Sequence, residues 1–292
     1  MKALRRKSEL IWLKHRAYNL AINRGMSNDK NSRGGEDAVA GPLTLALDTA
    51  TERRSVAVMR GARVVAGRAS DLRESGAASV LAEVDAALRD AGLKVRDVEL
   101  FAAASGPGSF TGLRSGIATL KALSHTLRRP AAGVPTLHAV AYGARPAGRL
   151  VALIPAGRGE VFAQFLSVDE GGRVGELSPP AHVSPARLVE RAAATGGVLR
   201  WAGGGALKYI ELIREAARAH GFAFVEADEG RGPADDEDAW QYAPTPDALA
   251  PAVGLLAQAR LRRGESPGAD DLRPLYVRPS DAELHEQCQV QS

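Results

Sequence analysis

A ten-residue stretch, Ser-Gly-Pro-Gly-Ser-Phe-Thr-Gly-Leu-Arg at 105–114, constrains the fold of this chain more than any other. It follows a strand-like apolar run over 98–104 and begins a helical pattern that reaches Leu127. Its first two glycines allow backbone angles that other residues avoid, and the proline between them fixes φ. Ser109 and Thr111 can cap free N–H groups of the new helix. The stretch predicts a sharp strand-to-helix turn, either a phosphate-handling or partner-docking site or simply a well-capped connection.

The helix that this turn begins has two different faces. Apolar residues recur at helical spacing and are expected to face a core: Leu113, Ile117, Leu120 and Leu127. Small residues occupy the other side: Gly112, Ser115, Gly116 and Thr119. Glycine inside a helix costs roughly 1 kcal/mol relative to alanine. Two glycines four residues apart therefore indicate close approach of another segment, either from this chain or from the helix of a partner.

The composition excludes several classes of protein. The chain has 292 residues, enough for two modest lobes, and 45% of them are hydrophobic. No run approaches the ~20 apolar residues of a membrane span. One cysteine, Cys288, excludes an internal disulfide framework and suggests an intracellular protein. The whole chain has a net charge of +4, and residues 1–40 alone carry +5. The rest of the chain is therefore nearly neutral and shows no overall positive field of the kind that binds nucleic acid.

The order of apolar runs and turns predicts an α/β protein with two lobes. Residues 1–41 are expected to form a basic, disordered extension, which is either an upstream start or, less in keeping with its composition, a targeting segment. The first lobe spans 42–147, the second spans 148–281, and a tail follows at 282–292. The expected elements of the first lobe are strands at 43–47, 55–59, 63–70, 98–104 and 131–134 and helices at 75–91, 110–127 and 136–142.

The second lobe is expected to repeat this order. Its predicted elements are strands at 150–154, 161–166, 198–202 and 222–225, helices at 184–195, after 205 and at about 246–263, and loops at 169–183 and 230–238. The last helix is a candidate to pack back on the first lobe.

The sequence shows weak signals for anion binding and no catalytic set. Asp48 ends a buried strand, where a carboxylate either caps a turn or holds a cation. A glycine triplet at 203–205 precedes a helix and is either a phosphate cradle or a plain loop. The six histidines are not spaced as helical metal ligands, and there is no nucleophile elbow and no P-loop. We therefore predict no catalytic residue and no metal site.

Three motifs occur in an order and spacing that resemble the TsaB (YeaZ) family. They are Leu-Ala-Leu-Asp-Thr-Ala-Thr-Glu at 45–52, the stretch at 105–114, and Gly-Val-Pro-Thr-Leu at 133–137. Gly-Glu-Val-Phe at 159–162 and Pro-Leu-Tyr-Val-Arg at 274–278 extend the match, which covers residues 43 to about 281.

The resemblance implies an actin-like, Hsp70-like ATPase (ASKHA) fold of two lobes, each with a mixed sheet flanked by helices. It implies a cytoplasmic, non-catalytic scaffold or dimerization subunit for tRNA N6-threonylcarbamoyladenosine synthesis, next to the anticodon. The implied partners are catalytic TsaD, which carries the metal, the ATPase TsaE, and tRNA indirectly through the complex; a homodimer is an alternative when TsaD is absent. No cofactor is expected to bind tightly, and ATP or ADP is expected only at the joint with TsaD.

Two sets of candidate residues follow. Helices 75–91 and 110–127 are the implied docking surface, and the candidate partner-interface residues are Gly112, Leu113, Ser115, Gly116, Thr119 and Leu120. The candidate phosphate- or nucleotide-proximal residues are Asp48, Thr49, Ser105, Gly106, Gly108, Ser109, Thr111 and Arg114.

This sequence departs from the family pattern at several positions. Residues 75–79 are Ser-Gly-Ala-Ala-Ser, whereas the family usually has His-Ser there. In the second lobe, Pro155 and Gly157 replace an Asp and an Arg that are frequent in the family. His138 replaces a common Glu. These departures concern ligand binding and contacts of the second lobe. The rival hypothesis is a stand-alone ATPase or small-molecule kinase of the same superfamily, with Asp48-Thr49 and 203–205 as phosphate loops.

Overall fold

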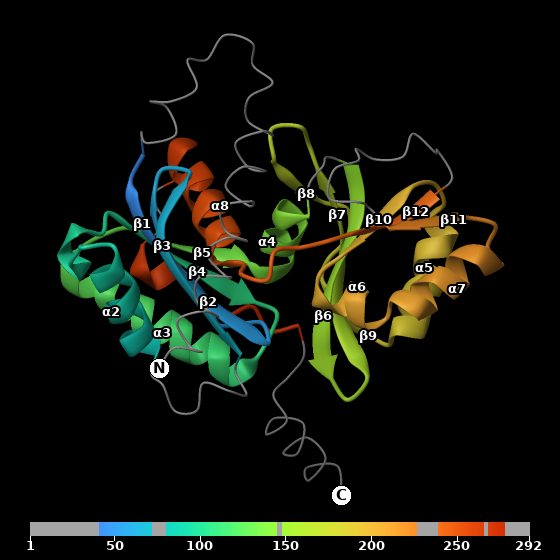
Figure 1. The fold of residues 1–292 in the computed structure, drawn as a ribbon, viewed down its shortest axis with the longest axis horizontal. Coiled ribbons are helices and arrows are strands. Elements are labelled where there is room, and N and C mark those ends of the chain that lie inside the picture. Colours follow the sequence, from blue (N-terminus) through green and yellow to red (C-terminus); the bar gives the residue numbers. More distant parts are fainter. Residues whose placement is uncertain (1–40, 72–79, 145–147, 227–238, 266–267, 278–292) are drawn as a thin grey trace, which may run out of the picture.

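The computed structural model describes residues 41–71, 80–144, 148–226, 239–265 and 268–277. Two α/β lobes lie side by side (Figure 1). Five of the predicted features lie wholly or largely outside the described residues: the extension at 1–41, the helix start at 75–79, the lobe boundary at 145–147, the acidic loop at 230–238 and the tail at 282–292.

The first lobe is built on a five-stranded sheet of order β3-β2-β1-β4-β5. Its strands are β1 (Leu43–Asp48), β2 (Arg53–Arg60), β3 (Arg63–Asp71), β4 (Leu100–Gly106) and β5 (Ala131–Pro135). Its helices are α2 (Val80–Asp90), the short η1 (Val95–Asp97), α3 (Phe110–Leu127) and α4 (Thr136–Gly143). Strand β2 runs antiparallel to β1 and β3, whereas β4 lies parallel to β1 and β5.

Both faces of the first sheet are covered, which explains why every residue of β1 is buried. Leu43, Leu45 and Leu47 face one core cluster together with residues of α2 and α3. Ala46 faces the opposite cluster, which contains residues of α8 (Ala250–Arg262). The side chains alternate between the two faces because successive residues of a strand point in opposite directions.

The second lobe repeats this topology around β6. Its strands are β6 (Gly148–Gly157), β7 (Glu160–Val168), β8 (Val174–Glu176), β9 (Ala181–Val183), β10 (Leu199–Ala202), β11 (Ala223–Glu226) and β12 (Ala239–Ala243). The order is β11-β12-β10-β6-β7-β8, and β9 also pairs with β7. Helices α5 (Pro185–Thr195), α6 (Gly204–Lys208) and α7 (Ile210–Ala219) complete the lobe. In each sheet the first strand (β1 or β6) runs antiparallel to the second (β2 or β7) and parallel to a later one (β4 or β10), so the protein has the actin-like fold.

Helix α8 returns from the second half of the chain to the first sheet, where it contacts β1, β2, β4 and β5 (Figure 1). A Cβ at Gly254 would lie 2.5 Å from the Met59 sulfur, so this glycine sets how closely the helix approaches. The helix is followed by η2 (Ala269–Asp271), which contacts α3 and β5.

Two predictions for the second lobe were wrong, and one strand was missed. The expected loop at 169–183 contains β8 and β9, which are three residues each and too short to show alternation. The helix expected after 205 is divided at Tyr209 into α6 and α7. Strand β12 was not predicted, although Trp240 within it is fully buried against Trp201.

Candidate functional site

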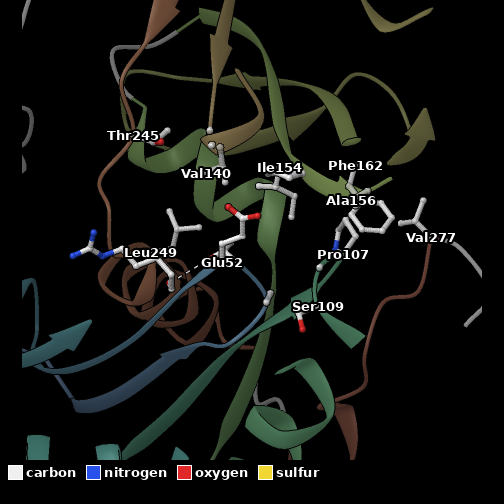
Figure 2. Close-up of a pocket in the computed structure, with 18 of the residues that line it drawn as sticks. Glu52, Pro107, Ser109, Val140, Ile154, Ala156, Phe162, Thr245, Leu249 and Val277 are labelled. Carbon is white, nitrogen blue, oxygen red and sulfur yellow. Dashed lines mark hydrogen bonds between the residues drawn. The ribbon is translucent and has the colours of Figure 1, made fainter. Parts of the chain in front are cut away.

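A cavity of about 750 Å³ opens between the two lobes (Figure 2). The first lobe contributes the loop after β1 (50–53) and the glycine-rich turn (107–111). The second lobe contributes the end of β6 (154–157), Phe162, and the start of α6. The segments 245–249 and 275–277 complete the wall. This volume lies within the usual range for small-molecule sites.

The glycine-rich turn is fixed by contacts within the first lobe. The Ser109 N–H donates to the Ala50 carbonyl (2.8 Å), and the Ser109 hydroxyl accepts from the Gly112 N–H (3.2 Å). A Cβ at Gly108 would lie 2.3 Å from the Ala50 carbonyl oxygen. Ser109 is therefore the N-cap of α3, and its hydroxyl points away from the cavity (Figure 2).

The segment 272–277 packs on the other side of this turn. The Leu275 N–H donates to the Ser105 carbonyl (2.6 Å), and a Cβ at Gly106 would lie 2.5 Å from the Leu275 carbonyl oxygen. Arg114 donates from Nε to the Tyr276 hydroxyl (3.1 Å), and its guanidinium lies 3.9 Å from the Phe110 ring centroid. Ser105, Gly106 and Arg114 thus hold the C-terminal segment in place and do not line the cavity.

Asp48 is fully buried and caps its own turn. Its carboxylate accepts from the Ala50 N–H (2.8 Å), from the Thr51 hydroxyl (2.5 Å) and from the Thr51 N–H (3.4 Å). Burial raises the pKa of Asp48, and these hydrogen bonds partly oppose the shift. Neither Asp48 nor Thr49 lines the cavity, so the turn-cap interpretation of Asp48 agrees with the geometry.

The glycine face of α3 is filled by Thr49. A Cβ at Gly112 would lie 1.9 Å from the Thr49 carbonyl oxygen, and a Cβ at Gly116 would lie 2.2 Å from its hydroxyl. Of the two alternatives for this face, the structure has close approach of a segment of the same chain, so Gly112 and Gly116 do not form an open surface for a partner. Leu113 and Leu120 are core residues, so in this conformation they cannot contact a partner. Ser115 is exposed and Thr119 is half-buried, so of this set these two reach the surface of α3.

The structure brings only part of the phosphate-proximal set to the cavity: Gly108, Ser109 and Thr111 line it, whereas Asp48, Thr49, Ser105, Gly106 and Arg114 do not. Sequence reasoning missed Glu52, whose side chain points between Val140 and Ile154 in Figure 2. Its position directly after the Asp-Thr-Ala-Thr turn is the signal that could have identified it.

Two glycines of the triplet at 203–205, Gly203 and Gly205, are required for packing. Gly203 has a φ of +101°, and a Cβ there would lie 2.3 Å from the Leu153 carbonyl oxygen. A Cβ at Gly205 would lie 3.0 Å from the same oxygen. These glycines bring α6 against β6; Gly203 and Gly204 also border the cavity.

Among the residues that the structure describes, the charged ones in the cavity wall are two acids, Glu52 and Asp247, and one base, Arg53. Arg53 Nη1 forms an ion pair with Asp247 Oδ2 (3.6 Å) although its buried Nε has no hydrogen-bond partner, whereas Glu52 is exposed to the cavity. Within the described residues no group of three or more His, Cys, Asp or Glu side chains could hold a metal ion. No helix among them is long and apolar enough to cross a membrane.

Comparisons with known proteins show similarity to proteins of tRNA modification. A family model described as TsaD, tRNA N6-adenosine threonylcarbamoyltransferase, matches residues 75–285. The tRNA threonylcarbamoyladenosine biosynthesis protein TsaB of Escherichia coli is 38% identical over 44% of this chain, and the match spans 56% of that relative. TsaB of Bacillus subtilis is 24% identical over 82% of this chain and 95% of its own length.

Solved structures agree with this result. YeaZ from Pseudomonas aeruginosa superposes with a TM-score of 0.60 at 26% identity, covering 80% of this chain and 99% of that one. A second structure from the same organism, titled as an uncharacterized protein similar to peptidase YeaZ, gives a TM-score of 0.61 at the same identity.

Proposed function

The chain belongs to the tRNA N6-adenosine threonylcarbamoyltransferase family, among its TsaB (YeaZ) members, and on this basis we propose that it is a non-catalytic accessory subunit. The proposed process is the synthesis of threonylcarbamoyladenosine next to the tRNA anticodon. In this proposal it acts in the cytoplasm, binds and supports a TsaD-type catalytic subunit, and contacts tRNA only through the complex. A TsaE-type ATPase joins them.

The observation that carries the non-catalytic role is the state of Asp48. An ATPase of this fold needs carboxylates that hold a metal ion at the phosphates. The carboxylate of Asp48 is buried and already accepts three hydrogen bonds from its own turn. It therefore stabilises a loop and is not directed at a ligand in the cavity.

A stand-alone ATPase or kinase is the weaker candidate. Arg53, the cation among the described cavity-lining residues, is paired with Asp247, and Glu52 would repel a triphosphate. We therefore propose that any ATP or ADP binds at the joint with the catalytic partner and that this chain alone binds none tightly.

We place the docking surface on the exposed faces of α2 and α3, which contact each other in the first lobe. Ser115, Ala118 and Ala122 are exposed on one side of α3 at spacings of three and four residues. Leu81 on α2 is 53% exposed. Small side chains on one helix allow another helix to approach closely, which suits a helix-to-helix contact. A homodimer through the same face is the expected state when the catalytic partner is absent.

The direct test is reconstitution of tRNA modification with purified subunits, with and without this chain. The modification is expected to require the chain, and the chain alone is expected to modify no tRNA. Enzyme-like ATP turnover by the purified chain alone would contradict the non-catalytic role.

The docking surface is tested by Ala118→Arg, with Ala194→Arg as the matched control. Both alanines are exposed on helices, but Ala194 lies on α5 of the second lobe. The first variant is expected to lose co-purification with the TsaD-type subunit and the second to keep it. Equal retention by both variants would place the interface elsewhere.

A further inference from the structure

The cavity between the lobes has apolar walls. Side chains from both lobes line it, including Val140, Ile154, Phe162 and Leu249. These four residues come from α4, β6, β7 and the residue that caps α8. In Figure 2, Val140, Ile154 and Leu249 lie around the Glu52 carboxylate, and Phe162 lies on the other side of Ile154, beside Ala156. An apolar ligand body would be removed from water on several sides there, which favours its binding.

The rim of the cavity is also largely apolar, with the Arg114 guanidinium packed against Phe110 and Tyr276. Four of the large hydrophobic side chains that are exposed on the described residues belong to its lining: Phe110 (36% exposed), Leu207 (58%), Leu275 (39%) and Tyr276 (43%). Exposed apolar residues that gather around a concavity mark a binding site more often than scattered ones do. These residues come from α3, α6 and the segment 272–277, so the rim joins both lobes.

One charge in this apolar space is not neutralised by a neighbour. The carboxylate of Glu52 points into the cavity, and no ion pair or hydrogen bond engages it within the described residues (Figure 2). Arg53, the next residue, turns to Asp247 instead. The lining therefore offers a negative charge beside apolar surface. This combination is complementary to a cation with an apolar body and unfavourable for anions.

We propose that the interlobe cavity binds a small organic cation, an amine or amidine with an aromatic or aliphatic body, with its charged group at Glu52. The body lies between the β6 end and Phe162 on one side and Val140 and Leu249 on the other. This site is separate from the docking face on α2 and α3, so it does not depend on the proposed function.

The test compares two fluorescent probes that differ in their charged end. Dansylcadaverine carries an amine, and dansyl-6-aminohexanoate carries a carboxylate on a similar chain. Binding is measured with the purified full chain at low ionic strength, by the blue shift and increase of dansyl emission. Dansylcadaverine is expected to bind about fivefold more tightly or better, because a single ion contact at a partly exposed carboxylate is sufficient for such a ratio.

Three variants locate the site. Glu52→Gln is expected to reduce the ratio of the two affinities to about one without loss of the folded state, since Glu52 is exposed. Ala156→Trp places a large ring in the cavity wall and is expected to weaken both probes. Glu170→Gln, an exposed glutamate outside the cavity, is expected to keep the wild-type ratio. Failure of both probes to bind, equal affinities in the wild type, or an unchanged ratio in Glu52→Gln would overturn the proposal.

Discussion

At the scale of single residues, Thr49 determines how α3 sits on the first lobe. Its carbonyl oxygen occupies the space where a Gly112 side chain would begin, and its hydroxyl occupies the space beside Gly116. The two glycines meet different atoms of the same residue, one on the backbone and one at the end of a side chain. Their substitutions should therefore respond differently to a change at position 49.

We predict that Gly112→Ala destabilises the protein by about 1–3 kcal/mol, because overpacking against a backbone oxygen exceeds the helix-propensity gain of roughly 1 kcal/mol. Gly116→Ala should cost less, since a side chain can rotate away. Adding Thr49→Ala should rescue Gly116→Ala but not Gly112→Ala. Urea unfolding of the single and double variants measures this, and equal rescue of both would show that the approach of Thr49 is not the constraint.

Asp48 provides a second prediction at this scale. Burial raises its pKa in the folded state above 3.8, so its contribution to stability is full below that pH and is lost as pH rises through the folded pKa. In Asp48→Asn the side-chain amide can accept from the Ala50 N–H and donate to the Thr51 hydroxyl. The Thr51 hydroxyl can then donate to the Arg53 carbonyl, which lies 3.1 Å away.

Asp48→Asn should therefore be at least as stable as the wild type at neutral pH, and it should lack this loss of stability on raising the pH from about 4. Urea unfolding of both proteins from about pH 4 to about pH 7 checks the difference in slope. Retained tRNA modification by the variant would further support a structural role for Asp48. Loss of modification in a variant that remains stable would show instead that the Asp48 carboxylate is needed for function.

At the scale of elements, regular periodicity made the first lobe largely predictable. The pattern of small residues and leucines predicted where α3 begins and ends. The two separate strands expected before and after Gly61 are β2 and β3. Strands β8, β9 and β12 could not be found in the same way. They are three to five residues long, and their stability comes from pairing with β7 and β10, which local sequence does not encode.

The contact of α8 with the first sheet includes one buried amide. Gln258 donates from Nε2 to the Thr44 hydroxyl (3.0 Å) and to the Gly61 carbonyl (2.9 Å). Gln258→Met has a similar volume but leaves both acceptors without this donor, so we expect a loss of about 1–3 kcal/mol.

Gln258→Glu is the sharper variant at the same site. It keeps the shape but replaces the donor by a buried carboxylate, and it should be less stable than Gln258→Met at neutral pH. Thermal unfolding of the two variants ranks them. If both were as stable as the wild type, the amide would not be what fixes α8 on the sheet.

At the scale of the whole molecule, the candidate site could be predicted only in part. The glycine-rich turn was identifiable because it is continuous in sequence. The cavity was not, because its wall combines residues as distant as Glu52, Phe162 and Val277, which meet only when two similar sheets lie side by side. Which segment fills the glycine face of α3 could not be predicted for the same reason, since its occupant, Thr49, lies more than sixty residues earlier in the chain.

Helix α4 joins the two halves of the molecule, since it contacts β4 and α8 of the first lobe and β6, β7 and β8 of the second. On this helix, His138 Nε2 lies 3.0 Å from Glu176 Oε1 of β8. Burial lowers the pKa of His138 below 6.5, and the nearby Glu176 carboxylate opposes this shift. The stability that His138 contributes is thus present above 6.5 and is lost as pH falls through the lower folded pKa.

We expect the wild type to lose stability on acidification from about pH 7 to about pH 5, and His138→Gln to lose less, because glutamine can still donate to Glu176 but takes up no proton. The same substitution at exposed His220 is the control. Melting temperatures across this range measure the two slopes. Because His138 lies on the helix that contacts both sheets, its protonation should weaken the packing of the lobes. A wild-type slope identical to that of His138→Gln would show instead that acid acts on other groups.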